Sequence, residues 1–257
     1  MDIQSEGAPE PPPYIAGGQN DAEEVLQPGI LILNGHFVRA QTFDGTPLYE
    51  LSRDVRESAS GEARLAQLSL HRVVHNMRVN ADGTTRASQR NKHIFELKHL
   101  PPLLSTGYPY CLDAMSRTAM GNLALKSASF PRSGFKIVKV KPEKEDGFPK
   151  GYKARRESLK EGDLVFDVVK KRDHYEWMLT EGNRVAVEDK TEDELHRLVI
   201  TAPLTRKTMD AMIASWCLRI WRDSIKNNDS GKSIISSMSS GRDLQMRSGR
   251  EILPKFW

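Results

Sequence analysis

Hydrophobic and polar residues alternate with a period of two along most of residues 30–202, which is typical of half-buried β-strands. The segment ILILNGHFVRA (30–40), the turn signal Asp44-Gly45 and the segment TPLYELSRDV (46–55) together predict a hairpin. Turn residues or clusters of charge separate most later segments, so the pattern predicts about twelve short strands in all. The later segments are LSLHRVVHNMRV (68–79), KHIFELKHL (92–100), YPYCLDAMS (108–116), NLALKSASF (122–130), FKIVKVKP (135–142), YKARRESL (152–159), DLVFDVVKK (163–171), HYEWMLTEG (174–182), RVAVEDK (184–190) and ELHRLVITA (194–202).

The pattern changes after Pro203. Thr205 or Thr208 is a suitable cap for a helix, and MDAMIASWCLRIW (209–221) is apolar on nearly every side at the helical period. Such a helix is surrounded by protein or by lipid. Its apolar part spans roughly 20 Å at 1.5 Å per residue, which is too short to cross a hydrocarbon layer of about 30 Å. We therefore expect protein around it.

The strands and the helix together predict an architecture. About eight strands close into a barrel that their own side chains fill, whereas about twelve leave a lumen. An apolar helix would fill that lumen, so we expect a mainly β fold: a closed antiparallel barrel of about twelve strands that encloses one hydrophobic C-terminal helix, Thr208–Ile225. The alternative is a helix that covers one face of an open sheet.

Composition changes this picture at the two ends of the chain. Residues 1–28 are acidic and rich in Pro, and residues 227–257 are rich in Ser, Gly and Arg. Neither segment has enough apolar residues to offset the entropy lost on ordering, so we expect both to be disordered and the folded domain to be residues 29–226. The net charge of +4 includes −6 from residues 1–28 and +3 from residues 226–257. The remaining +7 favours an anionic partner.

Two segments resemble a known superfamily. The hairpin at 30–55 is the first, and ELHRLVITAPLTRKTMDAMIASWCLRIW (194–221) is the second, in which a strand, a Pro-Leu step and an apolar helix follow one another. Both resemble the tubby C-terminal-like superfamily, which includes the tubby proteins, the phospholipid scramblases and the LURP-one-related proteins. The chain looks closest to fungal members with a hairpin like YELSRDV (49–55). The resemblance covers roughly residues 28–226 and implies a closed barrel around a central helix.

The resemblance carries over only in part. Scramblases have an acidic calcium-binding segment before the helix, but Thr205, Arg206 and Lys207 occupy those positions here. Their cysteine-rich palmitoylation segment is also absent, so we carry over neither property. Tubby proteins bind phosphoinositides through basic residues on this fold, which implies the same ligand class here.

The segment 136–160 is the best binding signal, because it carries a net charge of +5. The apolar residues of FKIVKVKP are expected to point partly inward, so that the lysines project outward. If this strand pairs with YKARRESL, several cations converge, and such clusters attract anionic lipid headgroups. A solvated strand face whose lysines discourage edge-to-edge pairing stays open as the alternative. The candidate lipid-binding residues are Lys139, Lys141, Lys153, Arg155 and Arg156.

Catalytic and metal signals are weak. Cys111 has Asp113 on its strand face but no identifiable His partner, so we expect no nucleophile. His71 and His75 lie in a predicted strand, where residues four apart are about 13 Å apart. The acidic segment EDKTEDE (188–194) lacks the pattern of a calcium loop and is expected to be a solvated turn, with weak calcium binding as the alternative. We expect no catalytic residue, no metal ligand and no cofactor.

The expected function is therefore binding without catalysis. The domain is expected in the cytoplasm, peripheral at a membrane or nuclear, because the chain shows no secretory signal and no apolar window of about 18 residues. Its expected partners are anionic phospholipids, phosphoinositides among them. A protein-interaction or structural module that acts through its disordered termini is the main alternative, and an enzyme with a ligand-lined cavity is the third. Nothing resembles a nucleic-acid-binding motif, so we expect no nucleic-acid partner.

Overall fold

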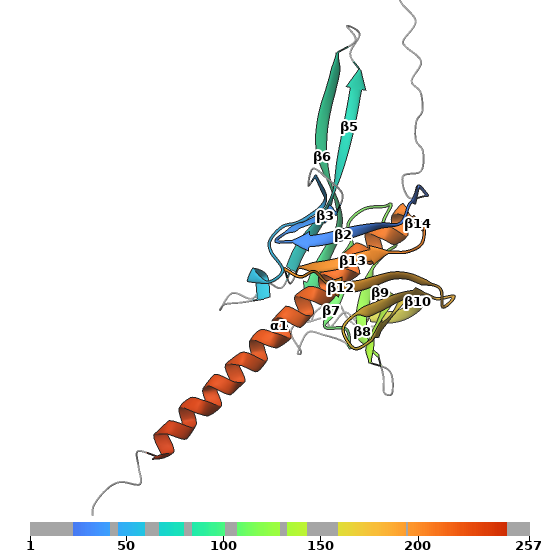
Figure 1. Ribbon diagram of the computed structural model, residues 1–257. Coiled ribbons are helices and arrows are strands. Elements are labelled where there is room, and N and C mark those ends of the chain that lie inside the picture. The colour runs from blue at the N-terminus through green and yellow to red at the C-terminus, as the bar shows by residue number, and fades with distance from the viewer. Residues whose placement is uncertain are drawn as a thin grey trace, which may run out of the picture.

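The structure is a closed β-barrel with one helix inside it. A computed structural model of the chain describes residues 23–41, 46–59, 67–79, 84–100, 107–128, 133–142, 159–193 and 195–245. Twelve antiparallel strands, β2 to β13, follow one another around the barrel in sequence order, and the pairing of β13 with β2 closes it. Figure 1 shows α1 passing through this ring of strands. The mainly β barrel with a central C-terminal helix is confirmed, and the open sheet is excluded.

The strands are mostly short, but four of them are long. The barrel strands are β2 (Gly29–Asn34), β3 (Phe37–Ala40), β4 (Pro47–Leu51), β5 (Gln67–Val79), β6 (Thr85–His99), β7 (Tyr110–Ala114), β8 (Leu123–Ser127), β9 (Gly134–Pro142), β10 (Leu159–Lys170), β11 (Tyr175–Leu179), β12 (Arg184–Lys190) and β13 (His196–Ile200). A separate two-stranded sheet joins β1 (Val25–Leu26) to β14 (Leu204–Thr205), and a short 3-10 helix, η1 (Glu57–Ala59), follows β4.

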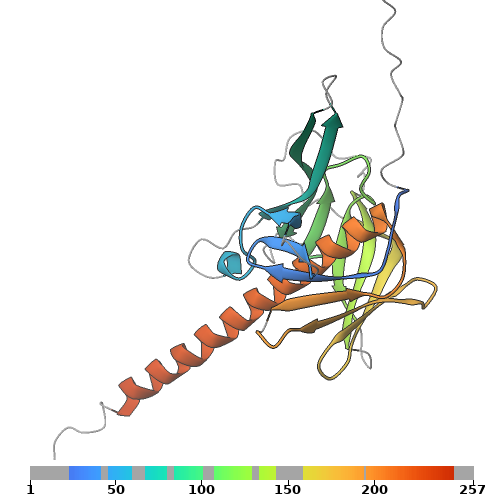
Figure 2. The same ribbon diagram turned by 45° about the horizontal axis from the view of Figure 1, so that its top comes forward.

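The helix α1 (Arg206–Gln245) begins after a capping residue. The Oγ1 atom of Thr205 accepts a hydrogen bond of 3.3 Å from the backbone N–H of Thr208, as expected for an N-cap. Every residue from Met209 to Arg222 is buried, which explains why this part of the helix is apolar on all sides. In Figure 2 the later part of α1 extends away from the strands.

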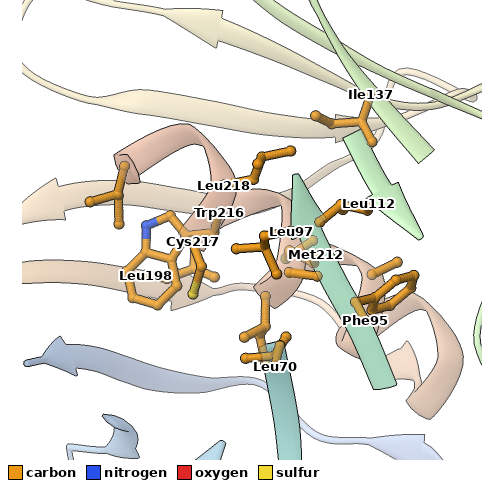
Figure 3. Close-up of a cluster of buried hydrophobic side chains, with 14 of the residues drawn as sticks. Leu70, Phe95, Leu97, Leu112, Ile137, Leu198, Met212, Trp216, Cys217 and Leu218 are labelled. Atoms are coloured by element: carbon orange, nitrogen blue, oxygen red, sulfur yellow. The ribbon is translucent and has the colours of Figure 1, made fainter. Parts of the chain in front are cut away.

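The core lies between the helix and the inner face of the barrel. Met212 and Trp216 have no exposed surface, and Ala214, on another side of the helix, has none either. Figure 3 shows the helix side chains surrounded by Leu70, Phe95 and others from the strands. Aromatic and aliphatic side chains of the strands fill the lumen around the helix. The apolar side chains of the helix therefore pack against residues of this same chain.

The first predicted strand is two strands. Residues 30–40 divide into β2 and β3, and a two-residue turn at Gly35-His36 joins them. Gly35 has φ of +61°, a conformation that favours glycine and that two-residue hairpin turns require at their first position. The predicted hairpin partner of residues 46–55 is therefore β3 alone. The predicted strand at 152–159 lies outside the described residues except for Leu159, the first residue of β10.

The division into a folded domain at residues 29–226 and two disordered ends stays a prediction. Val25 and Leu26, just before residue 29, pair with β14, and Leu26 packs against the core. At the other boundary α1 continues to Gln245, into the predicted disordered tail. A helix that has already formed inside the barrel adds further turns without repeating the unfavourable nucleation step. Residues 1–22 and 246–257 lie outside the described residues.

Candidate functional site

The two ends of the barrel differ in chemistry. We call the end where α1 begins the start end and the end where α1 leaves the exit end. Because neighbouring strands are antiparallel and follow the sequence, β3, β5, β7, β9, β11 and β13 all run towards the start end. The connections between β3 and β4, β5 and β6, β7 and β8, and β9 and β10 therefore lie at that end.

At the start end, β9 and β10 form a basic extension. The pairing of β8 with β9 stops at Lys139, and β11 pairs with β10 only from Phe166 onward. Beyond these limits, residues 140–142 pair with residues 159–161. Lys141 and Lys160 are partners in this ladder and both side chains are exposed. We call Lys139, Lys141 and Lys160 the basic extension.

The predicted direction of β9 was partly wrong. Val138 and Val140 do not point into the lumen, because they pack in a small outer cluster with Cys111 and Ala124. Alternation then places Lys139 on the inward face, in line with Ile137 of the main core. Its side chain is 41% exposed, and its Nζ atom lies 3.5 Å from Oδ2 of Asp163.

The described residues include two of the five predicted lipid-binding residues, Lys139 and Lys141. Lys153, Arg155 and Arg156 lie outside the described residues. The structure thus brings Lys139 and Lys141 together with Lys160, which the prediction did not include as a binding residue. Lys160 could have been included from the sequence, because it is the last residue of the basic segment 136–160.

Apolar side chains are exposed at the same end. Among the described residues, the exposed large hydrophobic side chains are Val25 (56%), Leu48 (37%) and Met115 (53%). Val25 is on β1, Leu48 is on β4 just after its start, and Met115 directly follows β7. All three positions belong to the start end. Each of them would bury apolar surface if this end met an apolar partner.

A second projection at the start end was missed in the sequence. The pairing of β4 with β5 reaches Arg72, and β7 pairs with β6 only from Phe95 onward, so the rest of β5 and β6 forms a two-stranded ribbon. Figure 1 shows it rising from the barrel. Residues 84–91 are exposed, including Arg86 and Arg90. They lack the apolar alternation of a half-buried strand, although Asp82-Gly83 was a hairpin signal.

A largely apolar cavity opens beside the first turns of α1. This start cavity has a volume of about 720 Å³, and its lining includes Leu26 of β1, Ala40 of β3, Leu48 of β4 and Met209 of α1. The volume lies within the range of about 300–1,000 Å³ that is common for small-molecule sites. Its charged lining residues are two arginines, Arg72 and Arg206.

A buried hydrogen-bonded network supports this cavity. The Tyr49 hydroxyl donates to Oδ1 of Asp210 at 2.6 Å, and Nη1 of Arg72 donates to Oδ2 at 3.0 Å. All three residues are buried. Burial, followed by the charge of Asp210 and its hydrogen bond, raises the pKa of Tyr49 well above its usual value. Tyr49 therefore stays protonated and donates its hydrogen bond to a carboxylate that α1 carries.

The exit end is polar. A cavity of about 570 Å³ there is lined by Arg219, Glu188 and Asp223 among others. Glu188 is buried and accepts a hydrogen bond from Arg219, and Asp189 pairs with Arg197 at 2.7 Å. The segment 188–194 is therefore not simply a solvated turn, because arginines hold its first two acidic side chains.

The other chemical candidates have structural surroundings. Burial, followed by the charge of Asp113, raises the pKa of the Cys111 thiol to about 12, so the reactive thiolate does not form near neutral pH. His71 stacks on His93 with a centroid distance of 4.7 Å, and both lie on paired strands. Within the described ranges, no cluster of three or more His, Cys, Asp or Glu side chains could hold a metal ion. No helix there is long and apolar enough to cross a membrane.

The start end therefore combines cations, exposed apolar side chains and a largely apolar cavity. The exit end combines a polar cavity, paired charges and exposed cations such as Lys170 and Arg172. The resemblance to the tubby-like superfamily stays a prediction from residues 30–55 and 194–221. Comparisons of the chain with protein-family models, with curated proteins and with solved structures found no match.

Proposed function

We propose that this protein is a non-catalytic binding domain that docks on anionic phospholipids with the start end of its barrel. The observation that carries the proposal is the presence of two kinds of side chain at one end. The basic extension supplies Lys139, Lys141 and Lys160, and the loops and edges supply Val25 and Leu48 among the exposed apolar residues. This combination suits a surface that has charged headgroups above an apolar interior.

The lysines would attract the protein to an anionic membrane, and the exposed apolar side chains would enter the membrane's apolar interior. A Lys or Arg near an anionic membrane contributes about 1 kcal/mol, and this contribution falls off within a Debye length. Lys141 and Lys160 would therefore contribute roughly 2 kcal/mol, and Lys139 adds less because the Asp163 carboxylate lies beside it. Each exposed apolar side chain adds favourable burial when it enters the interface. The superfamily resemblance points to phosphoinositides as the headgroup.

A vesicle sedimentation experiment tests the proposal. The full-length chain is mixed with phosphatidylcholine vesicles, with or without 5% phosphoinositide, at about 0.1 M salt, where the Debye length is about 10 Å. The expected result is binding to the anionic vesicles that weakens as salt is raised. The triple variant Lys139→Glu/Lys141→Glu/Lys160→Glu should lose it.

A matched variant at the exit end is the control. Lys170→Glu/Lys171→Glu/Arg172→Glu changes the net charge by the same amount on exposed positions far along the barrel axis from the start end. It should keep most of the binding. Equal sedimentation with both kinds of vesicle, or equal loss in the two triple variants, would contradict docking through the start end.

A second function is favoured by one observation. The helix α1 continues beyond the barrel at the exit end, and Figure 2 shows this part standing apart from the strands. An interaction module that recruits a protein through its C-terminal segment would use this helix. Pull-downs in which removal of residues 227–257 abolishes capture, while the start-end triple variant does not, would favour this function over lipid docking.

A further inference from the structure

The start cavity has no role in docking through the basic extension, yet it has the features of a ligand site. It is lined mostly by apolar side chains from six strands and from α1, and Tyr49, Arg72 and Arg206 supply polar atoms. Sites for small molecules combine an apolar lining with a few polar groups in this way. Its volume of about 720 Å³ leaves room for one extended hydrocarbon chain.

The charge at the cavity selects the head of the ligand. Arg72 is already held by Asp210, inside the fold. Arg206 is held differently, because its guanidinium donates at 2.8 and 3.1 Å to Oε2 of Glu24, a half-exposed side chain before β1. A carboxylate therefore already sits on Arg206 at the edge of the cavity.

The segment that carries Glu24 also covers the cavity. Leu26, Gln27 and Pro28 line it, and the segment is attached by the two residue pairs of β1 with β14. The backbone N–H of Arg206 donates to the carbonyl of Glu24 at 2.6 Å. Displacement of the Glu24 carboxylate by another anion requires the loss of its two hydrogen bonds to Arg206, while the β1–β14 pairs and the packing of Leu26 can stay in place.

We propose that the start cavity binds one single-chain anionic amphiphile, with its apolar chain among Ala40, Met209 and Ile213 and its anionic head on Arg206 in place of Glu24. The site is distinct from the basic extension, and the inference does not depend on membrane docking. A fatty carboxylate and a single-chain phosphate ester share this chemistry, and they differ only in the head.

Titration calorimetry of the full-length chain with dodecyl ligands below their micellar concentrations tests the site. Dodecanoate, dodecyl phosphate, dodecanol and dodecyltrimethylammonium have the same chain and different heads. We expect one anionic ligand per chain, bound at least about tenfold more tightly than dodecanol, a difference of about 1.4 kcal/mol. The tighter of the two anions identifies the head. Equal binding of all four ligands, or none, would overturn the proposal.

Variants locate the ligand. Ala40→Trp fills the cavity and should weaken binding about tenfold or more, whereas Ala87→Trp on the exposed ribbon should not. Arg206→Gln should remove the preference for an anion, and Glu24→Gln should strengthen binding because it removes the competing carboxylate. If Ala40→Trp does not fold, the two charge variants still decide. Unchanged affinity in both would refute the site, and the basic-extension triple variant should bind as the natural sequence does.

Discussion

Tyr49 on β4 donates a hydrogen bond of 2.6 Å to Asp210 in the first turns of α1, across 161 residues of sequence. The bond joins the wall of the barrel to the helix that fills it, and Arg72 of β5 completes the network from the neighbouring strand. The helix is therefore held at the start end by polar contacts as well as by packing. A buried polar network of this kind also fixes how far the helix is inserted, because any shift would separate the charges.

Removal of the carboxylate should destabilise the fold strongly. Asp210→Leu leaves the buried Arg72 without its carboxylate, and loss of one partner of a buried ion pair typically costs about 3–5 kcal/mol. Tyr49→Phe should cost less, about 1.5–3 kcal/mol, because Arg72 still pairs with Asp210. Urea unfolding measures both. The double variant Arg72→Met/Asp210→Leu should be more stable than Asp210→Leu alone, and equal stability would argue against a coupled pair.

Stability should fall at high pH. Burial raises the pKa of Cys217 from 9.0 to about 12 in the folded protein, so the unfolded chain releases this proton first. Above pH 9 the unfolded state holds fewer protons than the folded one, and its stability rises relative to the fold. Between pH 9 and 11, Cys217 should lower the free energy of unfolding by up to about 1.4 kcal/mol per pH unit.

The variant Cys217→Ala isolates this effect. It should be less stable than the natural sequence at pH 7, because it loses buried volume, but its stability should fall less steeply above pH 9. Chemical denaturation at several pH values gives the two slopes. Parallel slopes would mean that Cys217 ionises equally easily in both states.

Gly134 at the start of β9 should be irreplaceable for a steric reason. It has φ of +143°, and a Cβ atom there would lie 2.0 Å from the carbonyl oxygen of Val168 on β10. Gly182 also has a positive φ, of +81°, but a Cβ atom there would meet nothing within 4 Å. Both Gly→Ala variants carry backbone strain of about 1–3 kcal/mol, and only Gly134→Ala adds a clash with backbone. Thermal unfolding should therefore rank Gly134→Ala clearly below Gly182→Ala, and the reverse order would contradict the geometry.

The sequence allowed the barrel and its helix to be predicted for one reason. Residues such as Met212, Ala214 and Trp216 are apolar on different sides of the helix, and only a complete enclosure leaves none of them in water. The count of about twelve strands agreed with the structure although its members differed. Gly35 divides the first predicted strand, and most of the predicted strand at 152–159 lies outside the described residues.

The candidate sites were harder to predict because they depend on register. Alternation alone could not show that Val140 packs in an outer cluster, since this depends on residues such as Cys111 and Tyr108 that lie on or near other strands. Partners far apart in sequence, such as Glu24 with Arg206, have no local signal at all. The first residues of β6, which form one strand of the ribbon, are mostly polar and exposed. They therefore show no hydrophobic periodicity from which a strand could be predicted.

Depth measurements with spin labels test the docking of the start end most directly. A label at Met115→Cys, just after β7, reports on the start end, and a label at Arg172→Cys, between β10 and β11, reports on the exit end. The natural thiols of Cys111 and Cys217 are buried and should not react with the label. With anionic vesicles, we predict that the label at position 115 gains accessibility to oxygen and loses accessibility to a water-soluble nickel complex, while the label at 172 does not change. If both labels stay in water while the protein sediments with vesicles, or if only the label at 172 enters the lipid, the start end is not the docking surface.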